Sequence, residues 1–357
     1  MKKFFLLIFA VPLLVLAWYS LSIHPGSAVL PTPTPYVALE PEPTPSPEPT
    51  AEPVVTPEPI ALSAAALTDS FIDDSFFEPC EQQGSVVTLS YLTRDYHYGT
   101  EGNYPKKLNA YLPYGYTEDR PYNVLFLLHI NGANENFWFP GELAYESRYV
   151  KLTDVLDNMI ARGLCEPMIV VSTCDYITND AAVAHDSVRD YDQFGHEFAN
   201  EILPLVVEEL STYAAGSSRS EIAEAREHFG VAGASFGSYM TRNSVLAPNL
   251  DLCANFAMIG GGSLRQDALR EEWSSAGLKP ENYPIHRLYI VEGEWDDRVE
   301  PERSYRALQG WTELFNADNL RYTMIRSATH DVREWVNGVF NSAQLFFRDD
   351  IPVEDAA

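Results

Sequence analysis

The sequence predicts an α/β fold built on an eight-stranded, mostly parallel sheet with helices on both faces. Short apolar runs recur along the chain, and most of the later ones are nearly continuous rather than alternating. Such runs are typical of strands that are covered on both faces. Segments with helical periodicity lie between the runs, which favours strands joined by helical crossovers. The motif Gly233-Ala-Ser235-Phe-Gly237 falls between one of these runs and a helix-like segment.

Composition limits the classes of partner. The 357 residues include 46% hydrophobic side chains, enough for a sizeable core, and carry a formal net charge of -27 from 51 acidic and 24 basic residues. A surface of this charge repels nucleic acid and anionic lipid headgroups, so we expect neutral or cationic partners. No Cys-x-x-Cys or His-x-x-x-His pattern occurs, and we expect neither a metal nor another cofactor.

The N-terminal part is predicted to lie outside the fold. Lys2 and Lys3 precede an uncharged stretch, 4–23, that is long enough to span a bilayer and longer than most signal-peptide cores. We predict that residues 1–28 form a signal anchor, with a signal peptide cleaved after Ala28 as the alternative. In both cases the rest of the chain is extracellular, either secreted or anchored to the cell surface.

Residues 29–66 are predicted to form a linker. Proline alternates there with threonine, glutamate and serine, a composition that cannot bury a core and that favours extended, solvated chain. The segment would hold a folded domain, residues 67–350, away from the cell surface. A merely disordered tail is the alternative, and it implies the same location.

The strands and helices of the domain follow from the hydrophobic pattern. The predicted strands are 86–92, 108–112, 123–129, 168–173, 229–234, 254–260, 288–292 and 321–325. The predicted helices are 149–163, 196–213, 302–317 and 332–347. Pro204 interrupts the second helix, where we expect a kink. Cys165 and Cys174 flank one strand, so about 20 Å would separate them and a disulfide between them is improbable. The pairing of the four cysteines otherwise stays open.

Ser235 is the predicted nucleophile. The motif that contains it follows the strand 229–234 and precedes a helix-like segment, as a nucleophile elbow requires. Small residues are needed on both sides of the serine because backbone packs against backbone there, and Gly233 and Gly237 meet that need. The alternative is a serine that only caps a helix.

A serine hydroxyl needs a base, which in turn needs an acid. In this architecture the chain order is serine, acid, histidine, and only His286 and His330 follow Ser235. His286 precedes a strand and belongs to the wrong end of the sheet, so His330 is the predicted base. The acids that follow the strand 288–291 are Glu292, Glu294, Asp296 and Asp297. Asp296 is the first choice and Asp297 the second, unless these acids only cap the next helix.

Two backbone N–H groups must stabilise the oxyanion. Phe236 supplies one because it follows the nucleophile. The loop after the strand 123–129 supplies the other, from Ile130 or Asn131. His129 is predicted to be structural because it precedes the nucleophile.

Several segments together carry a resemblance to a known family. They are "EPCEQQGSVVTLSY", "KKLNAYLPYGYTEDRPYNVLFLLH", "LLHINGANENFWF", "VAGASFGSYMT", "EGEWDD" and "ATHDVREW". In this order they resemble the esterase D-like carbohydrate esterases, which include feruloyl esterases and acetyl xylan esterases of the α/β-hydrolase fold. The resemblance covers about residues 78–347. It implies a triad of Ser235, Asp296 and His330, which matches the choice made from the residues.

Two departures from the family pattern concern the substrate. Ile130 stands where the family has a glycine, and Ser238–Tyr239 stands where the family has the second glycine of the elbow's tail. The bulkier Ile130 is expected either to reshape the oxyanion loop or to narrow the acyl pocket, and Ser238–Tyr239 is expected to crowd the same pocket. Trp138 and Trp335 are candidates for stacking on a sugar or an aromatic acyl group, with packing in the core or a lid as the alternative. The last two predicted substrate-binding residues are Asn134 and Tyr239.

The resemblance implies an extracellular serine esterase that removes feruloyl or acetyl groups from a plant cell-wall polysaccharide such as xylan, through an acyl-enzyme. Contact with a membrane would be limited to the N-terminal segment. An acyltransferase of the same fold and a non-catalytic carbohydrate-binding relative are the alternatives. The acyl group, the polysaccharide and the oligomeric state stay open at this point.

Overall fold

The computed structural model describes residues 62–96, 100–139, 151–176, 194–297 and 301–348. The predictions for residues 1–28 and for most of the linker lie outside these ranges. Within them, no helix is both long and apolar enough to cross a membrane. All four cysteines of the chain fall inside the described ranges and are free thiols.

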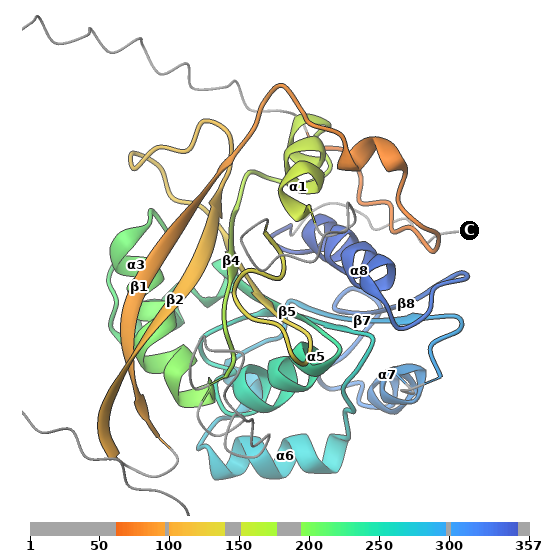
Figure 1. Ribbon diagram of the computed structural model, residues 1–357. Coiled ribbons are helices and arrows are strands. Elements are labelled where there is room, and N and C mark those ends of the chain that lie inside the picture. Colours follow the sequence, from red (N-terminus) through yellow and green to blue (C-terminus); the bar gives the residue numbers. More distant parts are fainter. Residues whose placement is uncertain (1–61, 97–99, 140–150, 177–193, 298–300, 349–357) are drawn as a thin grey trace, which may run out of the picture. The chain divides into compact units, whose positions relative to one another are not determined.

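Eight strands form a single sheet, which confirms the predicted fold class (Figure 1). They are β1 (Ser85–Asp95), β2 (Thr100–Leu112), β3 (Val124–Leu128), β4 (Ile169–Ser172), β5 (Phe229–Ala234), β6 (Asn255–Ile259), β7 (Arg287–Gly293) and β8 (Leu320–Ile325). Their order is β1-β2-β4-β3-β5-β6-β7-β8. β2 pairs antiparallel with both β1 and β4, whereas every pair from β4 to β8 is parallel. The sheet is therefore mostly parallel.

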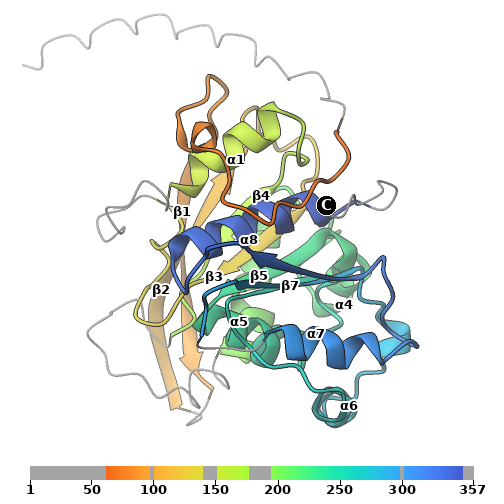
Figure 2. The ribbon, with the colours of Figure 1, turned by 90° about the vertical axis from the view of Figure 1, so that its right-hand side faces the viewer.

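Helices cover both faces of the sheet, as Figure 2 shows. Among the described residues, the α-helices are α1 (Leu152–Ala161), α3 (Leu203–Glu209), α4 (Arg219–Glu224), α5 (Phe236–Met240), α6 (Gln266–Ser275), α7 (Pro301–Gln309) and α8 (Val332–Leu345). Alternate residues of β3 enter two separate cores. Phe126 and Leu128 pack in the core that contains residues of α3, α6 and α7, and Leu125 and Leu127 pack in the core with α1 and α8. This double burial explains the continuous apolar runs.

The helices differ in detail from the sequence-based expectations. The helix expected at 302–317 ends at Gln309, because Gly310 follows and the chain continues in turns. The interruption at Pro204 is accommodated by a π-helical turn, η3 (Phe198–Ile202), directly before α3. α4 and α6 were not predicted.

The folded unit begins a few residues earlier than expected. Ser63 donates its backbone N–H to Gly163, and the Ala66 N–H donates to the side chain of Gln344. Ala65 is only 2% exposed. The linker boundary at residue 66 is thus too late, because the small side chains of this segment pack against the domain.

The parallel strands end at one edge of the sheet, and that edge positions the site. The paired registers bring Leu128 beside Gly233 and Ala234 beside Ile259. The ends of β7 and β8 are likewise paired. In open parallel sheets, ligands bind outside the carboxyl ends of the strands, and all the predicted chemical residues follow these ends.

Candidate active site

Ser235 occupies a sharp turn between β5 and α5. Its backbone angles, φ 53° and ψ -112°, lie in a region that side-chain-bearing residues seldom adopt, so the turn is strained. Glycines make the turn feasible: a Cβ on Gly233 would lie 2.0 Å from the carbonyl oxygen of Gly237, and a Cβ on Gly237 would lie 2.5 Å from that of Leu128. The motif therefore has the geometry expected of a nucleophile elbow.

A continuous hydrogen-bond chain runs from Ser235 through His330 to Asp296. Ser235 Oγ lies 2.8 Å from His330 Nε2, and His330 Nδ1 donates to Asp296 Oδ2 over 2.7 Å. The Asp296 side chain is completely buried, whereas the His330 side chain retains 10% exposure. Asp297, the second choice for the acid, is exposed and takes no part in these hydrogen bonds. The structure thus brings together the three residues proposed for catalysis.

The local backbone holds these side chains in place. The Ser235 N–H donates to Ile259 at the end of β6, and the Asp296 N–H donates to Gly293 at the end of β7. His330 comes after β8, directly before α8. Its ring packs edge-on against Trp335, with the ring centroids 5.4 Å apart. An oriented nucleophile, base and acid can perform covalent acyl transfer.

A second buried carboxyl group, that of Glu334, lies beside the histidine. Its Oε1 accepts the Gly293 N–H over 2.8 Å, and its Oε2 lies 3.9 Å from His330 Nδ1. The absence of a side chain at Gly260 makes room for it, since a Cβ there would lie 2.8 Å from Oε2. Burial, followed by the negative charge of Asp296, raises the pKa of Glu334 to about 9. Glu334 therefore carries a proton at neutral pH.

This raised pKa predicts how stability depends on pH in Glu334→Gln. The folded state keeps the Glu334 proton between about pH 4.5 and pH 9, whereas the unfolded state loses it, so the wild-type residue costs stability as pH rises through that window. Glutamine is neutral throughout. We expect Glu334→Gln to raise the free energy of unfolding at pH 8, by on the order of a few kcal/mol, and with it the melting temperature, and to change both little at pH 4.

Thermal unfolding of both proteins across this pH range measures the effect. Glu271→Gln, at an exposed position, is the control and should show no pH-dependent difference. A stability difference between Glu334→Gln and wild type that stays constant from pH 4 to pH 8 would contradict the buried, protonated state.

Asp296, His330 and Glu334 are residue types that also bind metal ions. Asp296, His330 and Glu334 place ligand atoms within 4.8 Å of one another. Both ring nitrogens of His330, however, already take part in the hydrogen-bond chain to Ser235 and Asp296. We therefore assign His330 and Asp296 to the hydrogen bonds with Ser235 and not to a metal site.

The loop proposed for the oxyanion site follows β3 and faces the elbow. Gly132 adopts a left-handed conformation with φ 79°. The carbonyl oxygen of Ile130 accepts the Ala133 N–H and also lies 2.7 Å from His129 Nδ1. A trans peptide points its N–H away from its C=O, so these contacts fix the direction of the Asn131 N–H. Ile130 and Asn131 remain the two proposed donors beside Phe236.

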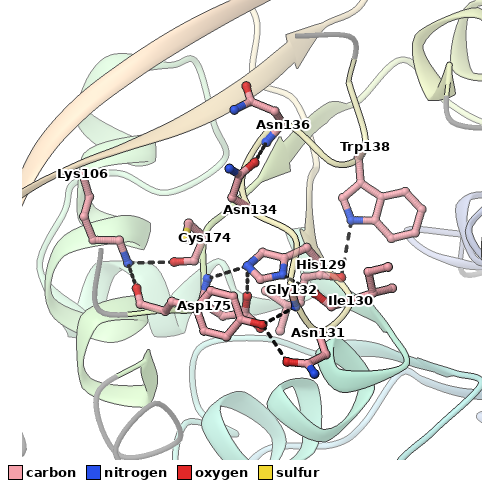
Figure 3. Close-up of polar contacts among 12 residues, drawn as sticks. Lys106, His129, Ile130, Asn131, Gly132, Asn134, Asn136, Trp138, Cys174 and Asp175 are labelled. Atoms are coloured by element: carbon pink, nitrogen blue, oxygen red, sulfur yellow. Dashed lines mark hydrogen bonds and ion pairs between the residues drawn. The ribbon is translucent and has the colours of Figure 1, made fainter. Parts of the chain in front are cut away.

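His129 holds this loop in place through contacts of its ring. It is fully buried, and its Nε2 forms an ion pair with Asp175 (Figure 3). Burial would lower the pKa of His129, but the charge of Asp175 outweighs burial and raises it to about 10. A histidine that stays protonated at neutral pH is unsuited to act as a base, which agrees with the structural role expected for it.

The predicted substrate-binding residues separate into two groups. Trp138 is completely buried and its indole N–H points to the carbonyl of Leu128, so stacking on a substrate is the wrong interpretation and core packing holds. Trp335 is 8% exposed and supports His330 instead. Asn134 is also buried, and its side chain accepts the Asn136 N–H within the loop (Figure 3). Trp138, Trp335 and Asn134 are therefore packed inside the protein and leave little surface for a substrate.

Tyr239 is the substrate-binding candidate that stays accessible. It is 38% exposed and lines a cleft of about 750 Å³ together with Asp297, at the side of α5. Arg265 and Asp267, which form an ion pair, also line this cleft. Polar walls of mixed charge suit a neutral, hydroxyl-rich molecule.

Two residues near the site were missed from the sequence. Glu334 lies four positions after His330, in the first turn of α8, and its carboxylate lies 3.9 Å from the ring of His330. Trp295 directly precedes Asp296 and is 61% exposed. Its position next to the predicted acid was the signal in the sequence that it lies near the site. Its exposure was not predictable from the sequence.

The chain is similar in sequence and in fold to known proteins. No family model matches the chain. The chain is 30% identical over 287 residues to endo-1,4-beta-xylanase Y of Acetivibrio thermocellus, a match that covers 77% of this chain and 24% of that protein. It is 24% identical over 247 residues to an endo-1,4-beta-xylanase/feruloyl esterase of Xylanibacter ruminicola, covering 67% of this chain and 29% of that protein. The chain thus spans about a quarter of the length of these relatives.

A solved structure resembles almost the whole domain. It is a feruloyl esterase module from Clostridium thermocellum, determined as a mutant in complex with sinapinate. The two chains are 25% identical with a TM-score of 0.64, and the match covers 84% of this chain and 100% of that module. The similarity therefore extends over one complete esterase module.

Proposed function

We propose that this chain is a carbohydrate esterase similar to the feruloyl esterases of the α/β-hydrolase fold, and that it removes feruloyl groups from cell-wall polysaccharide such as xylan. The hydrogen-bond chain from Ser235 to His330 to Asp296 carries the proposal. Feruloyl is favoured over acetyl because the similar module is a feruloyl esterase and was solved with the related aromatic acid sinapinate.

The proposed reaction has two acyl-transfer steps. Ser235 Oγ attacks the ester carbonyl while His330 Nε2 takes its proton, and Asp296 stabilises the imidazolium that forms. The N–H groups of Phe236 and of Ile130 or Asn131 bind the oxyanion. His330 then protonates the sugar alkoxide, which leaves. Water attacks the acyl-enzyme by the same route and releases the free acid.

The cleft beside Tyr239 is the proposed place for the sugar chain. Its polar lining suits hydroxyl groups, and it opens next to Asp297 and therefore close to the triad acid. Trp295 offers an exposed indole on the same edge of the sheet, a group that stacks well on a sugar ring. It takes the role first assigned to Trp138 and Trp335.

We further propose that the enzyme acts outside the cell. The uncharged stretch 4–23 and the proline-rich segment that follows are the basis, since together they suit export and a spacer. An enzyme outside the cell can reach a polysaccharide that is too large to enter the cell.

The full chain, purified in mild detergent, tests the proposal on methyl ferulate, feruloylated arabinoxylan, 4-nitrophenyl acetate and acetylated xylan. We expect release of ferulate from both feruloyl esters, with a kcat/KM for methyl ferulate at least about tenfold above that for 4-nitrophenyl acetate. Preference for the acetyl esters would reassign the acyl group. A folded protein that hydrolyses none of the four would overturn the proposal.

A further inference from the structure

We propose that Tyr176 is a positioning residue that ties the two halves of the oxyanion site together. The inference rests on the proposed function, because it concerns the amides that would bind the oxyanion. It assigns a task to a buried tyrosine that lies 59 residues before the nucleophile in sequence and follows β4.

The phenol of Tyr176 holds the oxyanion loop through two hydrogen bonds. Its hydroxyl accepts the Gly132 N–H over 2.7 Å and donates to Asn131 Oδ1 over 3.0 Å. Gly132 is the residue with the left-handed conformation, where the loop turns. One hydroxyl group thus fixes both the backbone and a side chain of the loop.

The ring of the same tyrosine contacts the other half of the site. Its centroid lies 5.8 Å from that of Phe236, the residue whose N–H is the proposed donor from the elbow. It also lies 4.9 Å from the ring of His129, at the start of the oxyanion loop. Tyr176 is 2% exposed, so its ring is enclosed by these neighbours. A single side chain therefore spans the gap between elbow and loop.

Buried charges hold the main chain of Tyr176. Lys106 Nζ donates to the carbonyl of Cys174 over 2.7 Å (Figure 3). It also donates to the carbonyl of Tyr176 over 2.6 Å and forms an ion pair of 2.6 Å with Glu197. Asp175, between these two carbonyls, pairs with His129. The lysine and both carboxylates are completely buried. The chain that leaves β4 is thus held at Cys174, at Asp175 and at Tyr176 itself.

The hydroxyl is the part that catalysis would depend on. An oxyanion hole works because its donors already stand where charge develops, so small displacements cost rate. Removal of the hydroxyl leaves the Gly132 N–H without its partner and releases Asn131. The loop would then sample positions in which its amide is misplaced, while the contacts that bind the ground-state substrate elsewhere remain.

Tyr176→Phe in the full chain tests this role, with Tyr289→Phe as the matched control. Tyr289 is completely buried in β7, and its hydroxyl accepts the Asn341 amide away from the site. We would measure kcat and KM for methyl ferulate, the rate at which a fluorophosphonate labels Ser235, and the melting temperature. We expect Tyr176→Phe to lower kcat and the labelling rate at least tenfold with KM changed less than threefold. Tyr289→Phe should keep both rates within twofold at a similar loss of stability.

Each outcome decides a separate point. A kcat and labelling rate for Tyr176→Phe within twofold of wild type would overturn the inference and leave the proposed function intact. Equal losses of rate in both variants would show a general loss of packing and would overturn it too. If wild type hydrolyses none of the esters but is labelled, the proposed substrate is wrong, and a tenfold slower labelling of Tyr176→Phe still supports the positioning role.

Discussion

Ser235→Ala should lower kcat/KM for methyl ferulate by at least about 10⁴-fold, the largest effect expected of any substitution in this chain. The reason is the geometry of the elbow. Ser235 Oγ is 2.8 Å from His330 Nε2 and has no substitute, because the turn presents one side chain to the end of the sheet. Alanine removes the attacking atom but fits the strained turn as well as serine does.

Steady-state kinetics of the purified variant measure this effect, with the melting temperature to show that the protein is folded. Ser211→Ala is the control, because that hydroxyl donates to the backbone of Arg120, far from the carboxyl edge of the sheet. It should retain activity within about twofold. A folded Ser235→Ala protein with more than a few per cent of wild-type activity would rule out Ser235 as the nucleophile.

Much of the sheet was predictable because burial on both faces leaves a local trace. β3, β5 and β6 are entirely buried; β3 and β5 correspond to unbroken apolar runs in the sequence, and β6 is apolar after its first residue, Asn255. α6 was missed because only Leu269 and Trp273 in it are buried and the rest of its surface is polar. A helix that contributes two core residues gives too weak a periodicity to detect.

The candidate site was predictable where chain order and spacing determine it. Ser235 is marked by the glycines that its turn needs, and His330 by its place after the last strand. The burial of Trp138 was not predictable, since a tryptophan is equally suited to a core and to a sugar platform. The network around His129 joins residues 46 positions apart, as in the contact between His129 and Asp175. Contacts of that range depend on the finished fold.

The sequence left the choice of acid open between Asp296 and Asp297. The structure favours Asp296, and a comparison of the two asparagine variants tests that choice. Asp296→Asn should lower kcat about 10³- to 10⁴-fold, with little loss of stability. Asp296 Oδ2 accepts from His330 Nδ1, which leaves Nε2 free to accept the serine proton. An asparagine that turns its amide N–H₂ toward the ring would favour the opposite tautomer, in which Nε2 carries the proton and cannot act as the base.

Asp297→Asn changes the same charge one residue further along and outside the hydrogen-bond chain, at an exposed position that lines the proposed sugar cleft. On methyl ferulate, which has no sugar, its kcat should fall less than about threefold. Where Asp297→Asn does impair the enzyme, we expect a higher KM for the feruloylated polysaccharide. A large fall in kcat for Asp297→Asn, with Asp296→Asn nearly unaffected, would transfer the role of the acid to Asp297. Comparable large losses in both variants would mean that the turn as a whole, rather than one carboxylate, orients His330.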